Sequence, residues 1–115
     1  MARLLWSIAV TIVFRGELFR RHDTGKHAET SERLVAIDRR LAASATFGSA
    51  AIGTPRVVTP EELCLIHDGG VMQRAQTVAA GGGGWLDQDT VLSRESYDVA
   101  LAAAGTSLAA VDEVM

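Results

Sequence analysis

The chain has 115 residues, of which 11 are basic and 14 are acidic, and its formal net charge is −3. This length allows one domain at most, with a modest hydrophobic core. The charges are spread along the chain and no basic stripe alternates with aromatic residues, so nucleic-acid binding is not indicated. The single cysteine, Cys64, cannot form an internal disulfide, which fits a reducing cytoplasm.

An apolar run from Leu4 to Phe14 opens the chain. The run is too short to span a bilayer, so no membrane association is expected. The charged and bulky residues that follow it contain no small-x-small cleavage site, which argues against a secretory signal. Because Ile8, Val10 and Ile12 are β-branched, the run predicts a buried strand of a parallel sheet, in preference to a targeting segment.

A helix is predicted to begin at Thr30 or Ser31, either of which can cap it. Its apolar residues recur at helical spacing, and they are Leu34, Ile37, Leu41 and Ala45. Two glycines and a proline within residues 48–55 then break the helix. The short apolar segment 56–58 follows as a candidate second strand.

The segment "TPEEL" predicts a second helix, because Thr59 can cap it, Pro60 fits its first turn and Glu62 completes a capping box. This helix is expected to end near residues 67–70, and another is expected over residues 71–80. The four glycines at 81–84 are predicted to form a loop because of their backbone entropy. No Gly-Lys-Ser/Thr follows them, so a phosphate-binding loop is not indicated.

The last predicted helix begins at Ser93 or Ser96 and runs to the end of the chain. One apolar stripe is expected to face the core, formed by Tyr97, Leu101, Ala104, Leu108, Val111 and Met115. Gly105 lowers helix propensity by about 1 kcal/mol relative to alanine. We therefore expect close backbone packing at this position.

Taken one at a time, the reactive side chains do not form a catalytic constellation. His22 and His27 are spaced like the histidine half of some zinc sites, but two further ligands at matching spacing are absent from the sequence. Cys64 lies in an apolar turn, where a small buried hydrophobic residue is the default. His67 and Asp68 stand at a helix boundary, where capping is the more frequent role.

Three segments, in order, resemble the histone deacetylase and acetylpolyamine amidohydrolase family, in particular its bacterial, class II-like members. "HDTGKHAETSERLVAI" resembles the family's opening signature, a His-Pro-Glu-x-Pro-x-Arg loop that leads into a helix. "VTPEELCLIHDGGVMQRAQ" resembles the next segment, a capped acidic helix followed by His-Asp or His-Ser. "GGGGWLDQDTVLSRESYDVALAAAGTSLAAVDEVM" is similar to the glycine-tryptophan loop and the long helix of small residues. The resemblance covers the chain from about Thr11.

The resemblance implies the N-terminal part of an arginase-like three-layer α/β domain with a parallel sheet, in which this chain is mostly helical with one or two strands. Residues 1–115 would be a partial deacetylase-like domain, truncated before the zinc site. The family's zinc ligands, paired histidines and transition-state tyrosine belong to later segments. The sequence also departs from the signature, with Ala28 and Ser31 in place of prolines and Val71 in place of an aromatic residue.

The resemblance assigns supporting roles to three residues. Arg33 matches the signature arginine, which lies by an internal channel near the catalytic pocket, and His27 matches the signature histidine. Asp89 matches a rim position at which many relatives use an acid to accept hydrogen bonds from substrate amides; a loop aspartate that only caps or is solvated is the open alternative. The resemblance places no catalytic residue and no metal ligand in this chain, while zinc is expected for the complete domain.

Two functions are therefore compatible with the sequence. One is the N-terminal fragment of a zinc-dependent amidohydrolase that hydrolyses acetyl-lysine or acetylpolyamine amides, inactive by itself. The other is a non-catalytic remnant or interaction module that self-associates through an exposed strand and apolar helices. Both are expected to be cytoplasmic.

Overall fold

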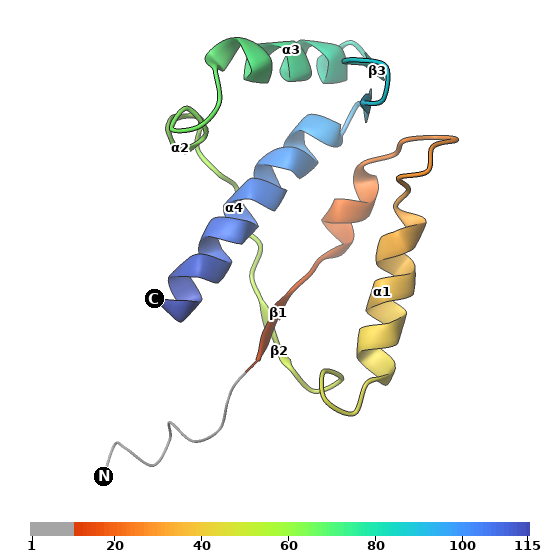
Figure 1. The fold of residues 1–115 in the computed structure, drawn as a ribbon, viewed down its shortest axis with the longest axis vertical. Coiled ribbons are helices and arrows are strands. Elements are labelled where there is room, and N and C mark those ends of the chain that lie inside the picture. Colours follow the sequence, from red (N-terminus) through yellow and green to blue (C-terminus); the bar gives the residue numbers. More distant parts are fainter. Residues whose placement is uncertain (1–10) are drawn as a thin grey trace.

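The computed structural model describes residues 11–115. Its elements in chain order are β1 (Ile12–Phe14), the 3-10 helix η2 (Glu17–Arg21), α1 (Glu32–Ala43), β2 (Ala51–Gly53), α2 (Pro60–Leu63), α3 (Gly69–Ala80), β3 (Gly83–Trp85), β4 (Val91–Ser93) and α4 (Ser96–Val114). Figure 1 shows the β1–β2 pair between α1 on one side and α4 on the other, with α3 above the start of α4.

The central unit is a β-α-β crossover. β1 and β2 pair in parallel, with Ile12 opposite Ala51 and Phe14 opposite Gly53, and α1 lies in the connection between them. A parallel pair requires such a crossover, which confirms the predicted α/β class with a parallel sheet. The predicted first strand is found at residues 12–14, where it is half-buried, whereas residues 4–10 of the prediction lie outside the described residues.

The second strand forms earlier than predicted, at residues 51–53 instead of 56–58. The segment 56–58 instead packs on α4: the Val58 N–H donates to the Leu101 carbonyl over 3.0 Å, and the Arg56 N–H donates to Thr106 Oγ1 over 3.3 Å. Val58 is only 4% exposed. Of the two valines that suggested a strand, Val58 is therefore buried against a helix, whereas Val57 is exposed.

The backbone of this segment approaches α4 at Gly105. A Cβ atom placed on Gly105 would lie 2.1 Å from the Arg56 carbonyl oxygen and 2.5 Å from the Val58 nitrogen, far inside van der Waals contact. Only glycine allows this approach. The predicted close backbone packing at Gly105 is confirmed.

The buried face of α4 differs from the predicted stripe. The buried residues are Ser96, Val99, Ala102, Gly105 and Thr106, whereas Leu108, Val111 and Met115 of the predicted stripe are exposed. The prediction was wrong because it followed the largest apolar side chains. The contact in fact requires small residues, since a backbone segment lies against the helix.

The predicted capping box of α2 is confirmed. The Thr59 hydroxyl accepts from the Glu62 N–H over 3.1 Å, while the Glu62 carboxylate accepts from the Thr59 N–H over 2.9 Å. The Arg56 guanidinium adds two hydrogen bonds to the same carboxylate, over 3.0 and 3.2 Å. α2 is nevertheless shorter than predicted, because it ends at Leu63. Cys64 beyond it is exposed, so its predicted burial was wrong: among the described residues no element covers this turn.

We predict that the Arg56–Glu62 pair makes stability depend on pH. Hydrogen bonds from Arg56 and then from Thr59 hold the pKa of the Glu62 carboxyl below its ordinary value of 4.5. Because the folded pKa is the lower one, the pair's contribution is present above about pH 4.5 and is lost as the pH falls through the folded pKa. Glu62→Gln, which can still cap, should therefore lower the urea midpoint at pH 7, and the difference from the parent should shrink below about pH 4.5. The control is Glu61→Gln at an exposed neighbour; equal midpoint losses in the two variants would contradict the prediction.

The start of α3 is capped as predicted. Asp68 accepts a hydrogen bond from the Gly70 N–H over 2.7 Å, which confirms capping at the His67–Asp68 boundary, although the helix begins at Gly69 rather than Val71.

α3 is followed by a β-hairpin that the sequence did not predict, in which β3 and β4 pair antiparallel. The glycine run was predicted as loop, yet Gly83 lies in β3 with a φ of 105°, and a Cβ there would lie 2.5 Å from the Leu92 carbonyl oxygen. Glycine thus permits the pairing.

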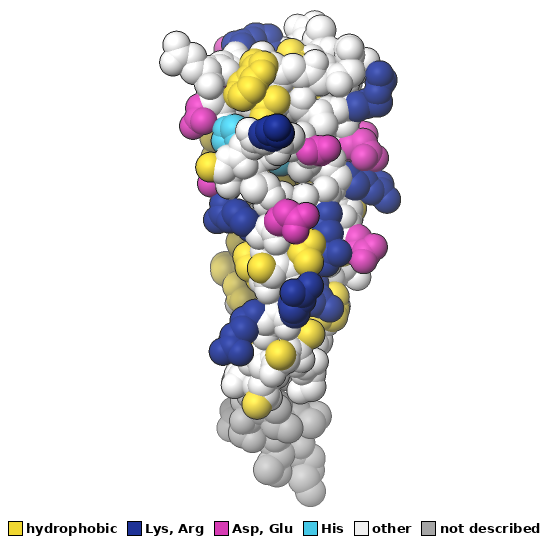
Figure 2. Space-filling model, turned by 90° about the vertical axis from the view of Figure 1, so that its right-hand side faces the viewer, with side chains coloured by type: hydrophobic (Ala, Val, Ile, Leu, Met, Phe, Trp, Pro, Cys, Tyr) yellow, Lys and Arg dark blue, Asp and Glu magenta, His cyan; other side chains and the backbone are white. Residues whose placement is uncertain are grey.

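The core of the described part is small. Its buried hydrophobic residues are Val58, Ala79, Val99 and Ala102, while twelve large hydrophobic side chains are exposed. Figure 2 views the α1 side of the molecule and shows hydrophobic side chains lying among Lys and Arg side chains. None of the helices within residues 11–115 combines the length and apolarity that crossing a membrane requires.

Candidate substrate-binding cleft

One cleft brings together two of the three predicted site residues. It has a volume of about 400 Å³ and lies between the loop of residues 22–29, the segment 89–92 and the first turns of α4. Its polar lining includes His22, His27, Glu29 and Asp89, and its apolar floor is formed by Val91, Val99, Ala100 and Ala103. The fold thus joins parts of the chain that are more than 60 residues apart in sequence.

His27 and Asp89 form a hydrogen-bonded pair at the rim. His27 Nε2 lies 3.1 Å from Asp89 Oδ1, and the Glu29 N–H donates to His27 Nδ1 over 3.0 Å. Because Nδ1 accepts, the proton of a neutral imidazole is on Nε2, which donates to Asp89. The His27 side chain is 15% exposed and that of Asp89 is 93% exposed. A fixed histidine therefore holds a carboxylate that stays open to solvent.

Neighbouring groups also orient the loop of Asp89. The Asp89 N–H donates to Asp87 Oδ1 over 2.9 Å. This bond, together with one from the Thr90 hydroxyl, holds the pKa of the Asp87 carboxyl below its ordinary value. The ring of Trp85 lies near His27, with ring centroids 6.3 Å apart and planes tilted by 49°. Asp89 is thus positioned both by the hydrogen bond that its backbone N–H donates to Asp87 and by the contact of its side chain with His27.

A second polar network, absent from the sequence prediction, anchors the start of the 22–29 loop. His22 Nδ1 lies 2.6 Å from Ser96 Oγ, and the Ser96 hydroxyl also accepts from the Ser93 N–H over 2.7 Å. Ser93 Oγ in turn accepts from the Asp23 N–H over 3.1 Å. Ser96 is only 3% exposed. Ser93 and Ser96, three residues apart at the start of the last helix, were the feature of the sequence that could have indicated this network.

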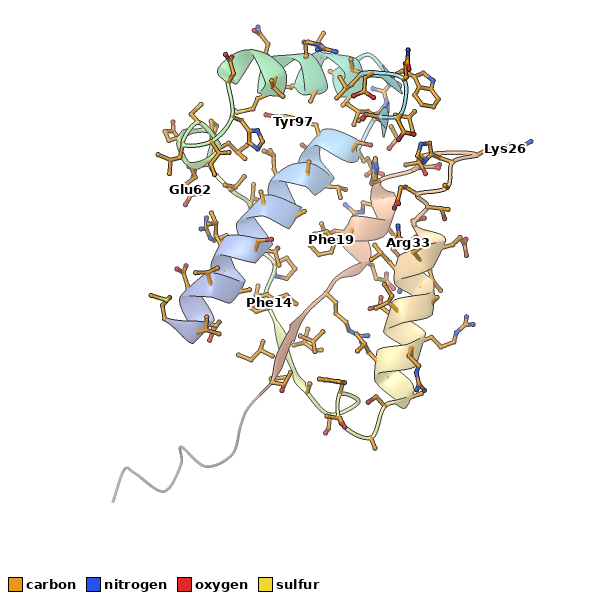
Figure 3. The ribbon with its side chains drawn as sticks, viewed as in Figure 1. Phe14, Phe19, Lys26, Arg33, Glu62 and Tyr97 are labelled. Carbon is orange, nitrogen blue, oxygen red and sulfur yellow. The ribbon has the colours of Figure 1, made fainter. Side chains whose placement is uncertain are left out.

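Arg33 lies on α1 outside this network. Its guanidinium pairs with Glu29, and both side chains are largely exposed. Figure 3 shows Arg33 near the start of α1, below the loop from which Lys26 projects outward. The predicted position beside an internal channel would need cover from chain outside residues 11–115, so this role stays a prediction.

The described residues do not fit a zinc site. Residues 11–115 contain no group of three or more His, Cys, Asp or Glu side chains that could hold a metal ion. His22 and His27, the histidines with zinc-like spacing, bond to Ser96 and Asp89 respectively. We therefore assign no metal-dependent step to this chain, and its predicted lack of a metal site stays a prediction.

The comparisons with known proteins agree with the resemblance found in the sequence. The chain is 28% identical over 109 residues to the "Probable deacetylase" of Methanothermobacter thermautotrophicus, an alignment that covers 90% of this chain and 31% of the relative. It is 28% identical over 89 residues to the "Histone deacetylase-like amidohydrolase" of Pseudomonas aeruginosa, covering 77% of this chain and 23% of that protein. No protein-family model matches the sequence.

The fold agrees as well. The crystal structure of the HDA15 HD domain matches this chain with a TM-score of 0.76 and 26% sequence identity, covering 84% of this chain and 30% of that one. The predicted resemblance to the histone deacetylase family is therefore confirmed in sequence and in fold. The chain spans between about a quarter and a third of the length of these three proteins.

Proposed function

We propose that this chain, which matches the deacetylase family in sequence and in fold, forms the N-terminal part of a histone deacetylase-like amidohydrolase domain. The domain would hydrolyse the acetyl amide of acetyl-lysine or of an acetylated polyamine, and it would act in the cytoplasm. The zinc that such a domain is expected to use would polarise the amide carbonyl and activate water. Its ligands would come from segments other than residues 11–115.

The observation that carries the proposal is the His27–Asp89 pair at the cleft rim. Asp89 has one carboxylate oxygen within reach of His27 and a side chain that is 93% exposed, so the rest of the carboxylate can accept hydrogen bonds from the N–H groups of a substrate. His27 does not contact the substrate in this proposal. It orients Asp89, as the Asp89–Asp87 backbone bond also does.

Catalysis would then divide between the two parts of the domain. This part supplies a rim acceptor, the 22–29 loop and an apolar floor for the substrate's methylene groups, formed by Val91, Val99, Ala100 and Ala103. The 115-residue chain alone should therefore neither bind stoichiometric zinc nor release acetate, because a metal-bound water, a proton shuttle and an electrophilic donor must converge on one carbon.

The test compares the chain alone with a chimera in which it replaces the aligned segment of the Pseudomonas aeruginosa relative. After refolding with zinc and dialysis, the chain alone should retain no stoichiometric zinc and release no acetate from acetyl-lysine peptides or acetylated polyamines. The chimera should be active, and Asp89→Ala should lower its kcat/KM by about tenfold, the loss of a hydrogen bond to a charged group, without changing its unfolding midpoint.

The matched control is Asp98→Ala, at an exposed acid on α4 away from the cleft lining, which should leave kcat/KM unchanged. Two results would overturn the proposal. One is a single zinc per isolated chain with turnover that a chelator abolishes. The other is a chimera that folds and binds zinc but hydrolyses neither substrate.

Exposed apolar surface favours the second candidate function, a non-catalytic, self-associating module. The large exposed side chains include Ile52, Val57, Leu108 and Val111, and surfaces of this kind are frequent interaction sites. For this candidate, sedimentation should show a concentration-dependent dimer of the isolated chain, whatever the outcome for the chimera.

A further inference from the structure

The hydrogen-bond network of His22 determines which of its ring nitrogens carries the proton of the neutral side chain. Ser93 Oγ accepts from the Asp23 N–H over 3.1 Å and donates to the Arg21 carbonyl over 3.4 Å. Ser96 Oγ lies 2.9 Å from Ser93 Oγ and 2.6 Å from His22 Nδ1. Because the Ser93 proton points to Arg21, the contact between the two hydroxyls needs the proton of Ser96. The contact at 2.6 Å then needs a proton on His22 Nδ1. This is the one placement of protons that makes every contact a hydrogen bond.

The other ring nitrogen of His22 is available to a molecule in the cleft. A neutral imidazole with its proton on Nδ1 has a lone pair on Nε2. Among residues 11–115, Arg20 Nε is the one buried side-chain nitrogen or oxygen without a hydrogen-bond partner, so His22 Nε2, which also has none there, is not buried. His22 lines the candidate substrate-binding cleft together with Ser96, on which it is held. Its Nε2 is therefore a hydrogen-bond acceptor that an occupant of the cleft can reach.

The side-chain hydrogen-bond donors of the cleft lining are already bonded within the chain. Apart from the pair of His22 and Ser96, the lining residues with such donors bond to neighbouring loop residues: Thr24 to the Glu29 carbonyl, His27 to Asp89 and Thr90 to the Asp87 carboxylate. The groups that remain open include His22 Nε2 and the exposed carboxylate of Asp89, and both are acceptors. A cleft lined in this way favours a ligand with N–H groups over an anion.

We propose that His22 is a substrate-binding residue, whose Nε2 accepts a hydrogen bond from an N–H group of the substrate inside the cleft. This inference rests on the proposed function for the identity of the substrate, an acetylated lysine or polyamine. Asp89 then contacts the substrate at the rim, while His22 contacts it next to α4, which carries most of the apolar floor. Two separate acceptors favour a substrate with N–H groups at two points along its length and disfavour one with a carboxylate at either point.

Long-range proton–nitrogen NMR of the isotope-labelled full chain tests the placement of the protons directly. At about pH 8, where an ordinary imidazole is neutral, His22 should carry its proton on Nδ1. His27 is the internal control with the opposite arrangement, because its Nδ1 accepts from the Glu29 N–H. Addition of N-acetylputrescine, an acetylated diamine, should shift the Nε2 resonance of His22 but not that of His67, which is exposed and outside the cleft lining. A proton on His22 Nε2, or an Nε2 resonance that the diamine does not move, would overturn the inference.

Two substitutions in the chimera separate substrate binding from anchoring of the loop. His22→Asn keeps an amide N–H at the δ position, which can still donate to Ser96, but it has no atom at the position of Nε2. His22→Gln places an amide oxygen near the position of Nε2 and loses the bond to Ser96. On N-acetylputrescine, His22→Asn should therefore lower kcat/KM about tenfold, and His22→Gln less than about threefold.

Hydrogen exchange of residues 22–29 in the same variants checks the anchoring. It should accelerate in His22→Gln and stay unchanged in His22→Asn. A larger loss of kcat/KM in His22→Gln than in His22→Asn would mean that His22 only anchors the loop, and would overturn the inference. A chimera without activity would refute the proposed function, whereas the NMR experiment, which needs no turnover, would still decide this inference.

Discussion

Replacing Gly105 by alanine should lower the free energy of unfolding by about 3 kcal/mol, at the upper end of overpacking effects. The added methyl group would lie 2.1 Å from the Arg56 carbonyl oxygen, and the nearest atoms are all backbone atoms that cannot rotate away. To accommodate it, the segment of residues 56–58 must move off α4. Urea unfolding followed by circular dichroism measures the effect.

Gly69→Ala is the matched control for this prediction. Gly69 is also a helical glycine, but a Cβ there meets no atom within 4 Å. The higher helix propensity of alanine should make this variant neutral or more stable by up to about 1 kcal/mol. If the two substitutions shift the midpoint equally, then close backbone packing does not explain the glycine in α4.

Ser96→Ala should detach the 22–29 loop from α4 and lower stability by about 2 kcal/mol. The buried hydroxyl has three polar partners, the Ser93 N–H, Ser93 Oγ and His22 Nδ1. Its removal leaves the Ser93 N–H and His22 Nδ1 without this partner, whereas Ser93 Oγ keeps its bond from the Asp23 N–H. Because His27 belongs to the same loop, the His27–Asp89 pair should loosen as well. Hydrogen exchange of residues 22–29 should therefore accelerate more than exchange in α3.

Ser107→Ala, on the same helix, is the control that separates the loss of the buried Ser96 hydroxyl from the change in helix propensity between serine and alanine. The Ser107 hydroxyl donates to the Ala103 carbonyl over 3.0 Å and is exposed, so its removal should change stability by less than about 0.5 kcal/mol. Unchanged exchange in the 22–29 loop of Ser96→Ala would mean that the serine network does not hold the loop.

Local signals in the sequence predicted much of the fold. Thr59, Pro60 and Glu62 predict a capped helix because these interactions span only four residues, and all of them are present. Gly105 also carried its own signal, a residue of low helix propensity inside an otherwise strong helix. By contrast, the part of the buried face of α4 around Gly105 and Thr106 packs on the backbone of residues 56–58, and no pattern within α4 identifies that segment as the partner.

The candidate site was only partly predictable for the same reason. The resemblance indicated His27 and Asp89 separately, but not that they meet, because their contact depends on the hairpin β3–β4, which carries Asp89 in its turn. That hairpin was missed because glycine entropy argues for loop, whereas at Gly83 a positive φ and close contact with Leu92 need glycine. The Ser93–Ser96–His22 network likewise joins residues that are distant in sequence.

The crossover between β1 and β2 has a consequence for the order in which the chain acquires its structure. Ile12 can pair with Ala51 only after the whole of α1 has been synthesised. The segment of residues 56–58, which follows β2, can pack on α4 only after α4 has been synthesised. Such non-local contacts slow folding, because the entropy of closing a long loop is lost before any contact compensates for it. At a synthesis rate of about 5–20 residues per second, several seconds therefore pass between the synthesis of β1 and that of its partner strand β2. In that interval the apolar residues Ile12, Val13 and Phe14 have not yet gained their partner strand, so their burial comes late in the folding of this part of the chain.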